Sequence, residues 1–197
     1  PRKIIGRTQG PILVPEESYE LSGYVPNVIF PSGVLLQGNT LSIYYGASDT
    51  TACVARVNFT DLISSMHLKY FEDWHFKRAK QNPILSPRSE NFFESKAVFN
   101  PAAIRISGKT HILYRALSND NVSTIGYAMT KDGINISERL NFPVYIPRED
   151  FENKKDNNAS SSGCEDPRIV KIEDNIYMCY TAFDGVSSPG VAVSFIK

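Results

Sequence analysis

The sequence predicts an all-β, propeller-like fold, because one pattern of short strands and turns recurs three times along the chain. In each repeat, the second residue of a tyrosine-led pair follows fourteen residues after a proline, and glycine or alanine comes next. A β-sandwich, the alternative, also has evenly spaced short strands, but it would not preserve an internal register this closely. The prolines and pairs are Pro31 with Tyr44-Tyr45, Pro101 with Tyr114-Arg115, and Pro167 with Tyr180-Thr181.

Each repeat opens with an extended segment bracketed by two prolines, at residues 11–15, 83–87 and 143–147. Prolines this close together exclude a helix and place the segment at the edge of a sheet or outside it. Three short runs rich in β-branched and aromatic residues then follow, separated by turn residues. The strands predicted from these runs are 33–36, 40–46 and 52–58, then 102–106, 110–116 and 124–130, then 168–172, 175–182 and 190–195.

Two segments connect the repeats. A helix is expected in residues 61–80, where Asp61 would cap a run that contains Leu62, Ile63, Met66 and Tyr70. Residues 148–162 hold almost nothing apolar and predict a solvated, mobile loop. The predicted organisation is therefore a blade at 1–60, a connector at 61–80, a blade at 81–147, and a loop and blade at 148–197.

Composition excludes several classes of function. The chain has 197 residues, enough for one substantial domain, and its 21 basic residues balance its 21 acidic ones. We therefore expect neither nucleic acid nor a membrane as a partner. The 3 cysteines lack C-x-x-C spacing, which argues against a disulfide framework and against a metal site. The first residues lack the apolar core of a signal peptide, so we expect a cytoplasmic protein, and nothing in the sequence calls for a cofactor.

Seven motifs are spread over nearly the whole chain: YVPNVIFPSG at 24–33, YYGASD at 44–49, NPIL at 82–85, VFNPA at 98–102, LYRA at 113–116, GCEDPRI at 163–169 and YMCYTA at 177–182. Together they resemble glycoside hydrolase family 130. This family consists of five-bladed propellers that are inverting β-mannoside phosphorylases and related β-mannosidases. The resemblance implies that residues 1–60 correspond to the family's last blade, 81–147 to its first and 148–197 to its second.

The blade order is permuted relative to the family, and about two middle blades of the family pattern are absent. Three blades do not close a five-bladed ring, so sheet edges and apolar faces would be left uncovered. We therefore expect a homo-oligomer, or completion of the ring by another copy or by a missing segment.

The resemblance also implies the site residues. Asp166 matches the family's general acid, whose proton is delivered through a sugar hydroxyl. One protein acid suffices if inorganic phosphate is the co-substrate, because phosphate itself then attacks the sugar. Since Asp166 precedes a proline, we expect extended backbone there, with the side chain projecting past the end of the strand. The alternative for an Asp-Pro step is a simple turn.

Six residues are predicted to bind substrate beside this acid. Arg115 is charged and lies mid-strand, so it needs a polar channel or a buried carboxylate as its partner. For Asn100 and Asp49 the alternative is a residue that only forms a turn. For Arg168 the alternative is a structural ion pair. The six residues are Asn100, Arg115, Asp49, Glu165, Arg168 and Tyr45.

The predicted function is therefore action on small β-mannoside oligosaccharides, by inverting phosphorolysis that releases mannose 1-phosphate. A β-mannoside hydrolase is one alternative. A sugar-binding or truncated propeller module without activity is another, because the family's phosphate-holding basic residues come largely from its middle blades.

Overall fold

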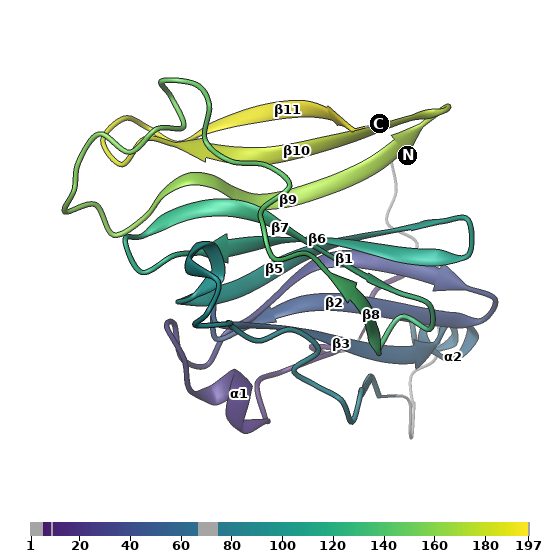
Figure 1. Cartoon of the computed structure of the whole chain (residues 1–197). Helices are drawn as coiled ribbons and strands as arrows, with labels where there is room; N and C mark the ends of the chain where they lie inside the picture. The colour runs from purple at the N-terminus through teal and green to yellow at the C-terminus, as the bar shows by residue number, and fades with distance from the viewer. Residues whose placement is uncertain (1–5, 9, 67–74, 197) are drawn as a thin grey trace.

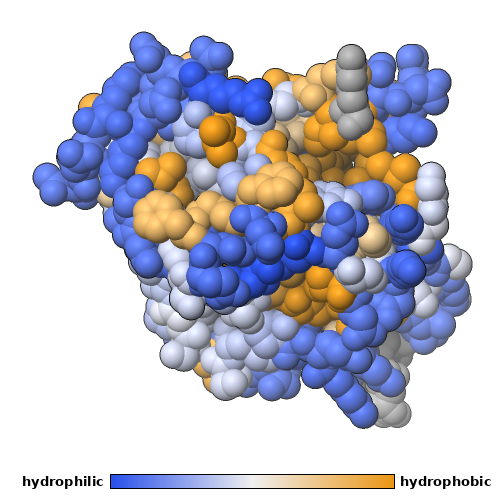
Figure 2. Space-filling view, viewed as in Figure 1, coloured by the Kyte–Doolittle hydropathy of each residue, from blue (hydrophilic) through white to orange (hydrophobic). Residues whose placement is uncertain are grey.

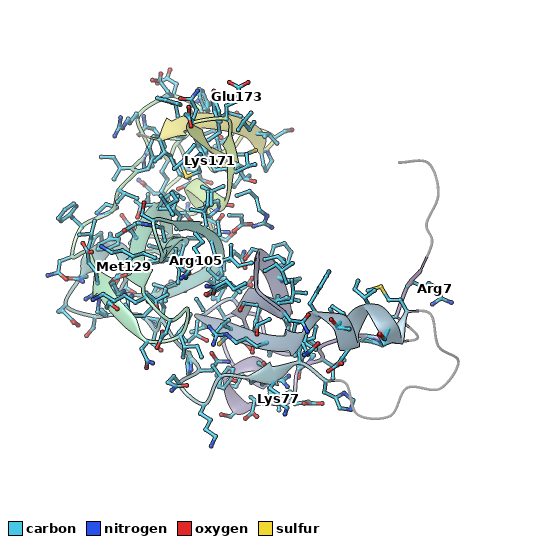
Figure 3. The ribbon with its side chains drawn as sticks, turned by 90° about the vertical axis from the view of Figure 1, so that its right-hand side faces the viewer. Arg7, Lys77, Arg105, Met129, Lys171 and Glu173 are labelled. Atoms are coloured by element: carbon cyan, nitrogen blue, oxygen red, sulfur yellow. The ribbon has the colours of Figure 1, made fainter. Side chains whose placement is uncertain are left out.

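The computed structural model describes residues 6–8, 10–66 and 75–196. The fold is mostly β, as the sequence predicts, and Figure 1 shows the three repeats stacked one above another. Turned by 90°, Figure 3 places Lys77 of the first repeat at the bottom, Arg105 of the second in the middle and Lys171 of the third near the top. The number of blades in a complete ring stays a prediction, because these sheets do not close into one.

The first repeat forms a four-stranded antiparallel sheet. Its strands are β1 (Ile29–Gln37), β2 (Thr40–Ala47), β3 (Thr51–Asn58) and β4 (Lys77–Arg78), paired in that order. The short helix α1 (Ser18–Leu21) precedes this sheet, and α2 (Phe59–Ser65) follows β3.

The second and third repeats share one sheet in the order β11-β10-β9-β7-β6-β5, and β8 pairs with β7. The two halves meet through a short parallel pairing of Val122 with Ser162 and of Ser123 with Gly163. The elements are η1 (Phe92–Glu94), β5 (Ala97–Ile106), β6 (Lys109–Leu117), β7 (Val122–Thr130), β8 (Ile136–Arg139), β9 (Ser162–Ile172), β10 (Asn175–Phe183) and β11 (Gly190–Ile196).

All the strands predicted in the repeats are present, but the first strand of each repeat starts earlier than expected. Asn100-Pro101 and Asp166-Pro167 lie inside β5 and β9 as bulges, each opposite one residue of the next strand. Asn100 has a φ of 49° and Asp166 a φ of 52°. The expectation of extended backbone at Asp166 is therefore wrong. The bulge requires a left-handed residue, which Asn and Asp tolerate better than most.

The helix in the connector begins two residues before its expected cap. Asn58 caps α2, since its Oδ1 accepts a hydrogen bond of 3.1 Å from the backbone N–H of Asp61. The prediction of Asp61 as the cap is wrong because Asn58, at the end of β3, already has the extended backbone that a cap needs. The expected helical residue Tyr70 lies outside the described residues, and residues 77–78 form β4 instead of helix.

The apolar core lies between the repeats. One cluster, which includes Tyr44 and Tyr114, packs the first sheet against the second repeat. Another, which includes Leu113 and Met178, packs the second repeat against the third. A further cluster covers the opposite face of the first sheet, beneath Leu62 of α2 and the segment that precedes α1.

A buried glutamate recurs in all three repeats, and the sequence analysis missed it. Each one is fully buried and accepts a hydrogen bond from a tyrosine hydroxyl in the second strand of its repeat. Each follows five to seven residues after the second proline of the bracketed segment. We call these residues the repeat glutamates: Glu20 with Tyr45, Glu94 with Tyr114, and Glu152 with Tyr180.

The repeat glutamates also anchor the loops that carry them. The backbone N–H groups of Arg148 and Glu149 donate to Glu152 Oε2 at 2.7 and 3.1 Å, and two N–H groups before Glu20 do the same. The prediction that residues 148–162 form a merely solvated loop is therefore wrong at Glu152. A single buried carboxylate holds the segment, although its composition is almost wholly polar.

Candidate functional site

The two bulges bring Asn100 and Asp166 together. Both residues occupy the same position in neighbouring repeats, on the first strands β5 and β9. Asn100 Nδ2 donates a hydrogen bond of 2.7 Å to Asp166 Oδ1. Asn100 is buried, whereas the Asp166 side chain keeps 30% of its surface exposed. The carboxyl group is thus held from one side and open to a ligand from the other.

Arg115 supplies the charge beside this pair. Its Nη1 lies 3.4 Å from Asp166 Oδ1, and its Nη2 lies 2.6 Å from Glu165 Oε1. Its guanidinium carbon also lies 4.8 Å from the ring centroid of Phe99, the residue opposite it on β5. The mid-strand arginine therefore has a buried carboxylate as its partner, one of the two alternatives expected from the sequence, and it contacts the predicted acid as well.

Asp49 extends the site to the first repeat. It lies half-buried in the turn between β2 and β3, with a φ of 49°. Burial raises the pKa of its carboxyl group, the positive charge of Arg115 opposes this rise, and the negative charge of Asp166 adds to it. The pKa of Asp49 therefore depends on the charges of Arg115 in the second repeat and of Asp166 in the third.

Glu165 is held by three hydrogen bonds from neighbouring side chains. Its Oε1 accepts hydrogen bonds from Arg115 Nη2 at 2.6 Å, Ser161 Oγ at 2.5 Å and Ser123 Oγ at 3.4 Å. Sequence reasoning missed both serines. No motif marks them, since only the pairing of β7 with β9 brings Ser123 close to Glu165.

Tyr45 and Arg168 are not brought into this cluster. Tyr45 is fully buried in the core, where its hydroxyl donates to Glu20 Oε1 at 2.8 Å. Arg168 is exposed, with its guanidinium carbon 5.5 Å from the ring centroid of Phe30. In the part of the chain that the structure describes, Arg168 forms no salt bridge.

The misplacement of Tyr45 comes from a register error of one residue in the first repeat. In the first repeat, strand pairing places Gly46 opposite Phe30. In the second repeat, it places Arg115 opposite Phe99, the residue equivalent to Phe30. Gly46, not Tyr45, therefore corresponds to Arg115, and Thr181 is the counterpart in the third repeat. A slip of one residue turns a side chain to the other face of a sheet. Tyr45 therefore corresponds to Tyr114 and belongs to the core position that contacts a repeat glutamate.

The glycine at that position makes room for the site. A Cβ atom at Gly46 would lie 2.5 Å from Asn100 Oδ1 and 2.9 Å from the Asn100 backbone nitrogen. Only a residue without a side chain lets β2 pass this close to the amide that contacts Asp166.

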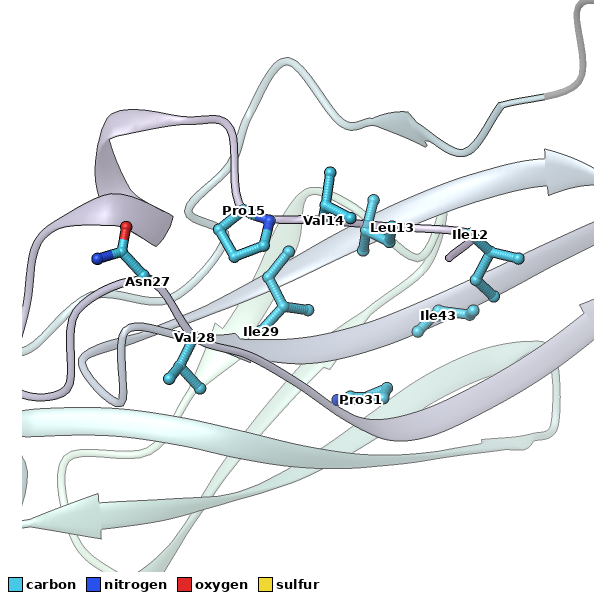
Figure 4. Close-up of a pocket in the computed structure, with 9 residues that line it drawn as sticks. All are labelled: Ile12, Leu13, Val14, Pro15, Asn27, Val28, Ile29, Pro31 and Ile43. Atoms are coloured by element: carbon cyan, nitrogen blue, oxygen red, sulfur yellow. The ribbon is translucent and has the colours of Figure 1, made fainter. Parts of the chain in front are cut away.

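A separate cavity of about 370 Å³ lies on the far face of the first sheet, between residues 12–15 and the start of β1, with Ile43 beside it. Figure 4 shows that its lining is almost wholly aliphatic. It holds no titratable side chain, so it is not the place where a glycosidic bond is protonated.

Two further observations concern cofactors and membranes. Among residues 6–8, 10–66 and 75–196, no group of three or more His, Cys, Asp or Glu side chains is arranged to hold a metal ion. In the same part of the chain, none of the helices is long and apolar enough to cross a membrane.

Comparison with known proteins identifies the family. The model of glycoside hydrolase family 130, described as beta-1,4-mannooligosaccharide phosphorylase, matches residues 2–68 and 64–189. The chain belongs to glycoside hydrolase family 130. The two matched segments meet at residues 64–68, inside the connector that the sequence analysis places between the permuted blades.

The relatives that the chain matches are named as mannoside phosphorylases, which agrees with the assignment to family 130. A 1,2-beta-oligomannan phosphorylase from Thermoanaerobacter sp. is 42% identical over 114 residues, which cover 54% of this chain and 36% of that protein. This family 130 chain thus spans about a third of the length of the curated relatives it matches. A glycosyl hydrolase structure from Bacteroides ovatus is 31% identical, covers 59% of this chain and 36% of its own, and has a TM-score of 0.50.

A wider fold similarity agrees with the predicted architecture. A thermostable family-43 glycoside hydrolase aligns with 88% of this family 130 chain and 50% of its own, at 15% identity and a TM-score of 0.57. At this identity the similarity concerns the fold alone. It places the chain among propeller-like glycosidase folds.

Proposed function

We propose that this chain acts on β-mannosides by inverting phosphorolysis, with Asp166 as the general acid and inorganic phosphate as the nucleophile. The observation that supports this most directly is the geometry at Asp166. Asn100 and Arg115 both direct N–H groups at Oδ1, at 2.7 and 3.4 Å. An oxygen that accepts from two donors is a poor place for a proton. The acidic proton therefore belongs on Oδ2, for which the described residues provide no hydrogen-bond partner.

The proposed reaction moves one proton and exchanges one bond. The proton on Asp166 Oδ2 passes, through a sugar hydroxyl, to the glycosidic oxygen, and the bond from that oxygen to the anomeric carbon breaks. A phosphate oxygen bonds to the anomeric carbon from the opposite face, which inverts its configuration. The products are mannose 1-phosphate and a saccharide shortened by one unit. The proton that hydrogen phosphate loses returns to Asp166 through solvent.

The other residues of the site are proposed to bind the substrate. The raised pKa of Asp49 suits a carboxyl group that exchanges hydrogen bonds with sugar hydroxyls in either protonation state. Arg168 is exposed beside the bulge and is free of salt bridges in the described part of the chain, so it is our candidate for an anionic contact. We propose β-1,2-linked manno-oligosaccharides as the first substrates, since the phosphorylase relative is named for that linkage. The family description names β-1,4 linkages, which makes these the second class to test.

A second candidate is a sugar-binding module without turnover. Arg115, the cation nearest to Asp166, is already neutralised by Glu165 at 2.6 Å and is a weak candidate for binding phosphate. The chain also spans about a third of the curated relatives' length. Residues that complete a phosphate site in longer relatives would then have no counterpart in this chain.

One experiment separates the candidates. The protein is incubated with β-1,2-mannobiose, β-1,4-mannobiose or a β-mannosylglucose, with and without phosphate, and ³¹P NMR follows the products. Mannose 1-phosphate that appears only with phosphate, and that Asp166→Asn abolishes, supports phosphorolysis. Free mannose formed without phosphate identifies a hydrolase instead. Sugar binding by calorimetry without any turnover supports the module and refutes the proposed enzyme.

We further propose that a second copy of the chain covers the open end of the third repeat. Five apolar side chains lie on one face of β9–β11, each more than half exposed: Val170, Ile172, Val191, Val193 and Phe195. Figure 2 shows exposed apolar residues at the upper right of that view, on the side where β9 ends in Figure 1. Sheet faces of the same kind already pack against each other twice within the chain. Light scattering should give a dimer or larger species that Val193→Asp dissociates, and a monomeric wild type would refute the proposal.

A further inference from the structure

Arg115 contacts two carboxylates, and the contacts are unequal. Nη2 lies 2.6 Å from Glu165 Oε1, whereas Nη1 lies 3.4 Å from Asp166 Oδ1. The side chains of Arg115 and Glu165 are each 11% exposed, against 30% for Asp166. Attraction between charges strengthens as the distance shortens and as water is excluded. Glu165 is therefore the main counter-ion of Arg115, and Asp166 is the minor one.

Two serines hold this ion pair in place, and they do so differently. Ser123 touches both partners, since its Oγ accepts from Arg115 Nε at 2.9 Å and lies 3.4 Å from Glu165 Oε1. Ser161 donates to Glu165 Oε1 at 2.5 Å. The Glu165 side of the pair thus depends on Ser161, while the Arg115 side has contacts of its own.

The structure also fixes where Ser161 stands. It is the last residue before β9, and Ser162 N–H donates to the carbonyl of Asn121 at 3.1 Å. Earlier in the same loop, Lys155 forms a salt bridge of 2.9 Å with Asp184, the residue that directly follows β10. Contacts with both the second and the third repeat therefore hold Ser161 against Glu165.

We propose that Ser161 is a positioning residue for the reaction: by holding Glu165 Oε1, it keeps Arg115 on Glu165 and leaves Asp166 free to donate its proton. The chemical part of this inference rests on the proposed function. Without the serine hydroxyl, Glu165 Oε1 retains only Arg115 and the longer contact to Ser123. Arg115 can then move toward Asp166 and form a shorter ion pair with it, which occupies the carboxyl group that has to deliver the proton.

Kinetics of three variants test the role. Ser161→Ala should lower kcat about tenfold and change KM by less than about twofold, because a hydrogen bond to a charged group is lost while the sugar contacts remain. Ser161→Thr keeps a hydroxyl and should restore kcat. Ser160→Ala, at the exposed neighbouring serine, is the matched control and should behave as wild type. An unchanged kcat in Ser161→Ala, or a rise in KM alone, overturns the proposal.

A measurement without substrate keeps the two proposals distinguishable. The ¹H–¹⁵N signal of Arg115 Nε–H, assigned by its loss in Arg115→Lys, reports the environment of the guanidinium. It should shift in Ser161→Ala and not in Ser160→Ala. If neither the wild type nor any variant turns over a mannoside but the signal shifts, Ser161 does position Arg115 through Glu165, and the proposed function fails. If the protein is active and the signal does not shift, the positioning role fails.

Discussion

Replacing Gly46 with alanine should damage the site without touching any group that carries out chemistry. The added methyl carbon would lie 2.5 Å from Asn100 Oδ1, 2.9 Å from the Asn100 backbone nitrogen and 3.4 Å from Phe99 Cβ. The first two distances are shorter than real contacts allow, and a backbone nitrogen on a paired strand cannot rotate away. Asn100 must therefore shift as a whole, and its hydrogen bond of 2.7 Å to Asp166 should lengthen or break.

Two opposing magnitudes set the expected result. Overpacking a close contact costs about 1–3 kcal/mol of folding free energy, whereas glycine-to-alanine in a strand returns about 0.5–1 kcal/mol by restricting the unfolded chain. The net loss of stability should thus be about 0–2.5 kcal/mol. The lost hydrogen bond to a carboxyl group costs about 1.5–3 kcal/mol in transition-state stabilisation, or roughly 10- to 150-fold in kcat/KM.

The assay compares phosphorolysis rates and urea unfolding of Gly46→Ala with those of Gly190→Ala. Gly190 has open space around its Cβ position, so its substitution controls for the change in residue type. Activity should fall far more in Gly46→Ala than its loss of stability explains, and Gly190→Ala should match wild type. The reasoning is refuted if Gly46→Ala keeps wild-type kcat/KM, since Asn100 would then not be a support of Asp166.

Three further predictions concern the rest of the fold. Glu94→Gln should destabilise the protein by about 3–5 kcal/mol in urea unfolding, because Arg88 and Arg139, now 2.6 and 2.7 Å from its oxygens, would lose their shared carboxylate. The repeat glutamates should make stability depend on pH: burial alone would raise the pKa of each, but its donors outweigh burial and lower it below the ordinary 4.5. A carboxyl group with a lowered pKa stabilises the fold above about pH 4.5, so Tm should fall as pH drops below that value, and a flat Tm down to pH 3 would contradict this. Burial raises the pKa of the Cys53 thiol to about 12, so a thiol reagent at pH 8 should label the half-buried Cys179 well before Cys53, as peptide mass mapping would show.

Much of this protein could be predicted from local sequence patterns. Strands and turns depend on residue types a few positions apart, so the order of strands within each repeat was predictable, and so was the helix after the third strand of the first repeat. The family was predictable for a similar reason, because its motifs are short and contiguous. Asn100 and Asp166 were both candidate site residues through the resemblance to the family, and the structure places them in contact at equivalent positions of neighbouring repeats.

Register and long-range partners were not predictable in this way. The sequence places Tyr45 opposite the same neighbours as Arg115, and strand pairing shifts it by one residue into the core. Polar residues at 148–162 suggest a free loop, whereas a buried Glu152 holds it. Tyr180, whose hydroxyl donates to Glu152, lies 28 residues further along the chain. The register that places Tyr45 depends on the pairing of β1 with β2. Neither contact can be inferred from neighbouring residues alone.

The sequence by itself therefore determined the repeats, the family and the identity of the candidate acid. Only the tertiary structure decided which oxygen of Asp166 accepts hydrogen bonds from Asn100 and Arg115, which carboxylate neutralises Arg115 and which serine holds that pair. The physical reason is that strand propensity and motif composition are local properties, whereas hydrogen bonding and the balance of buried charges depend on which strands come to lie next to one another.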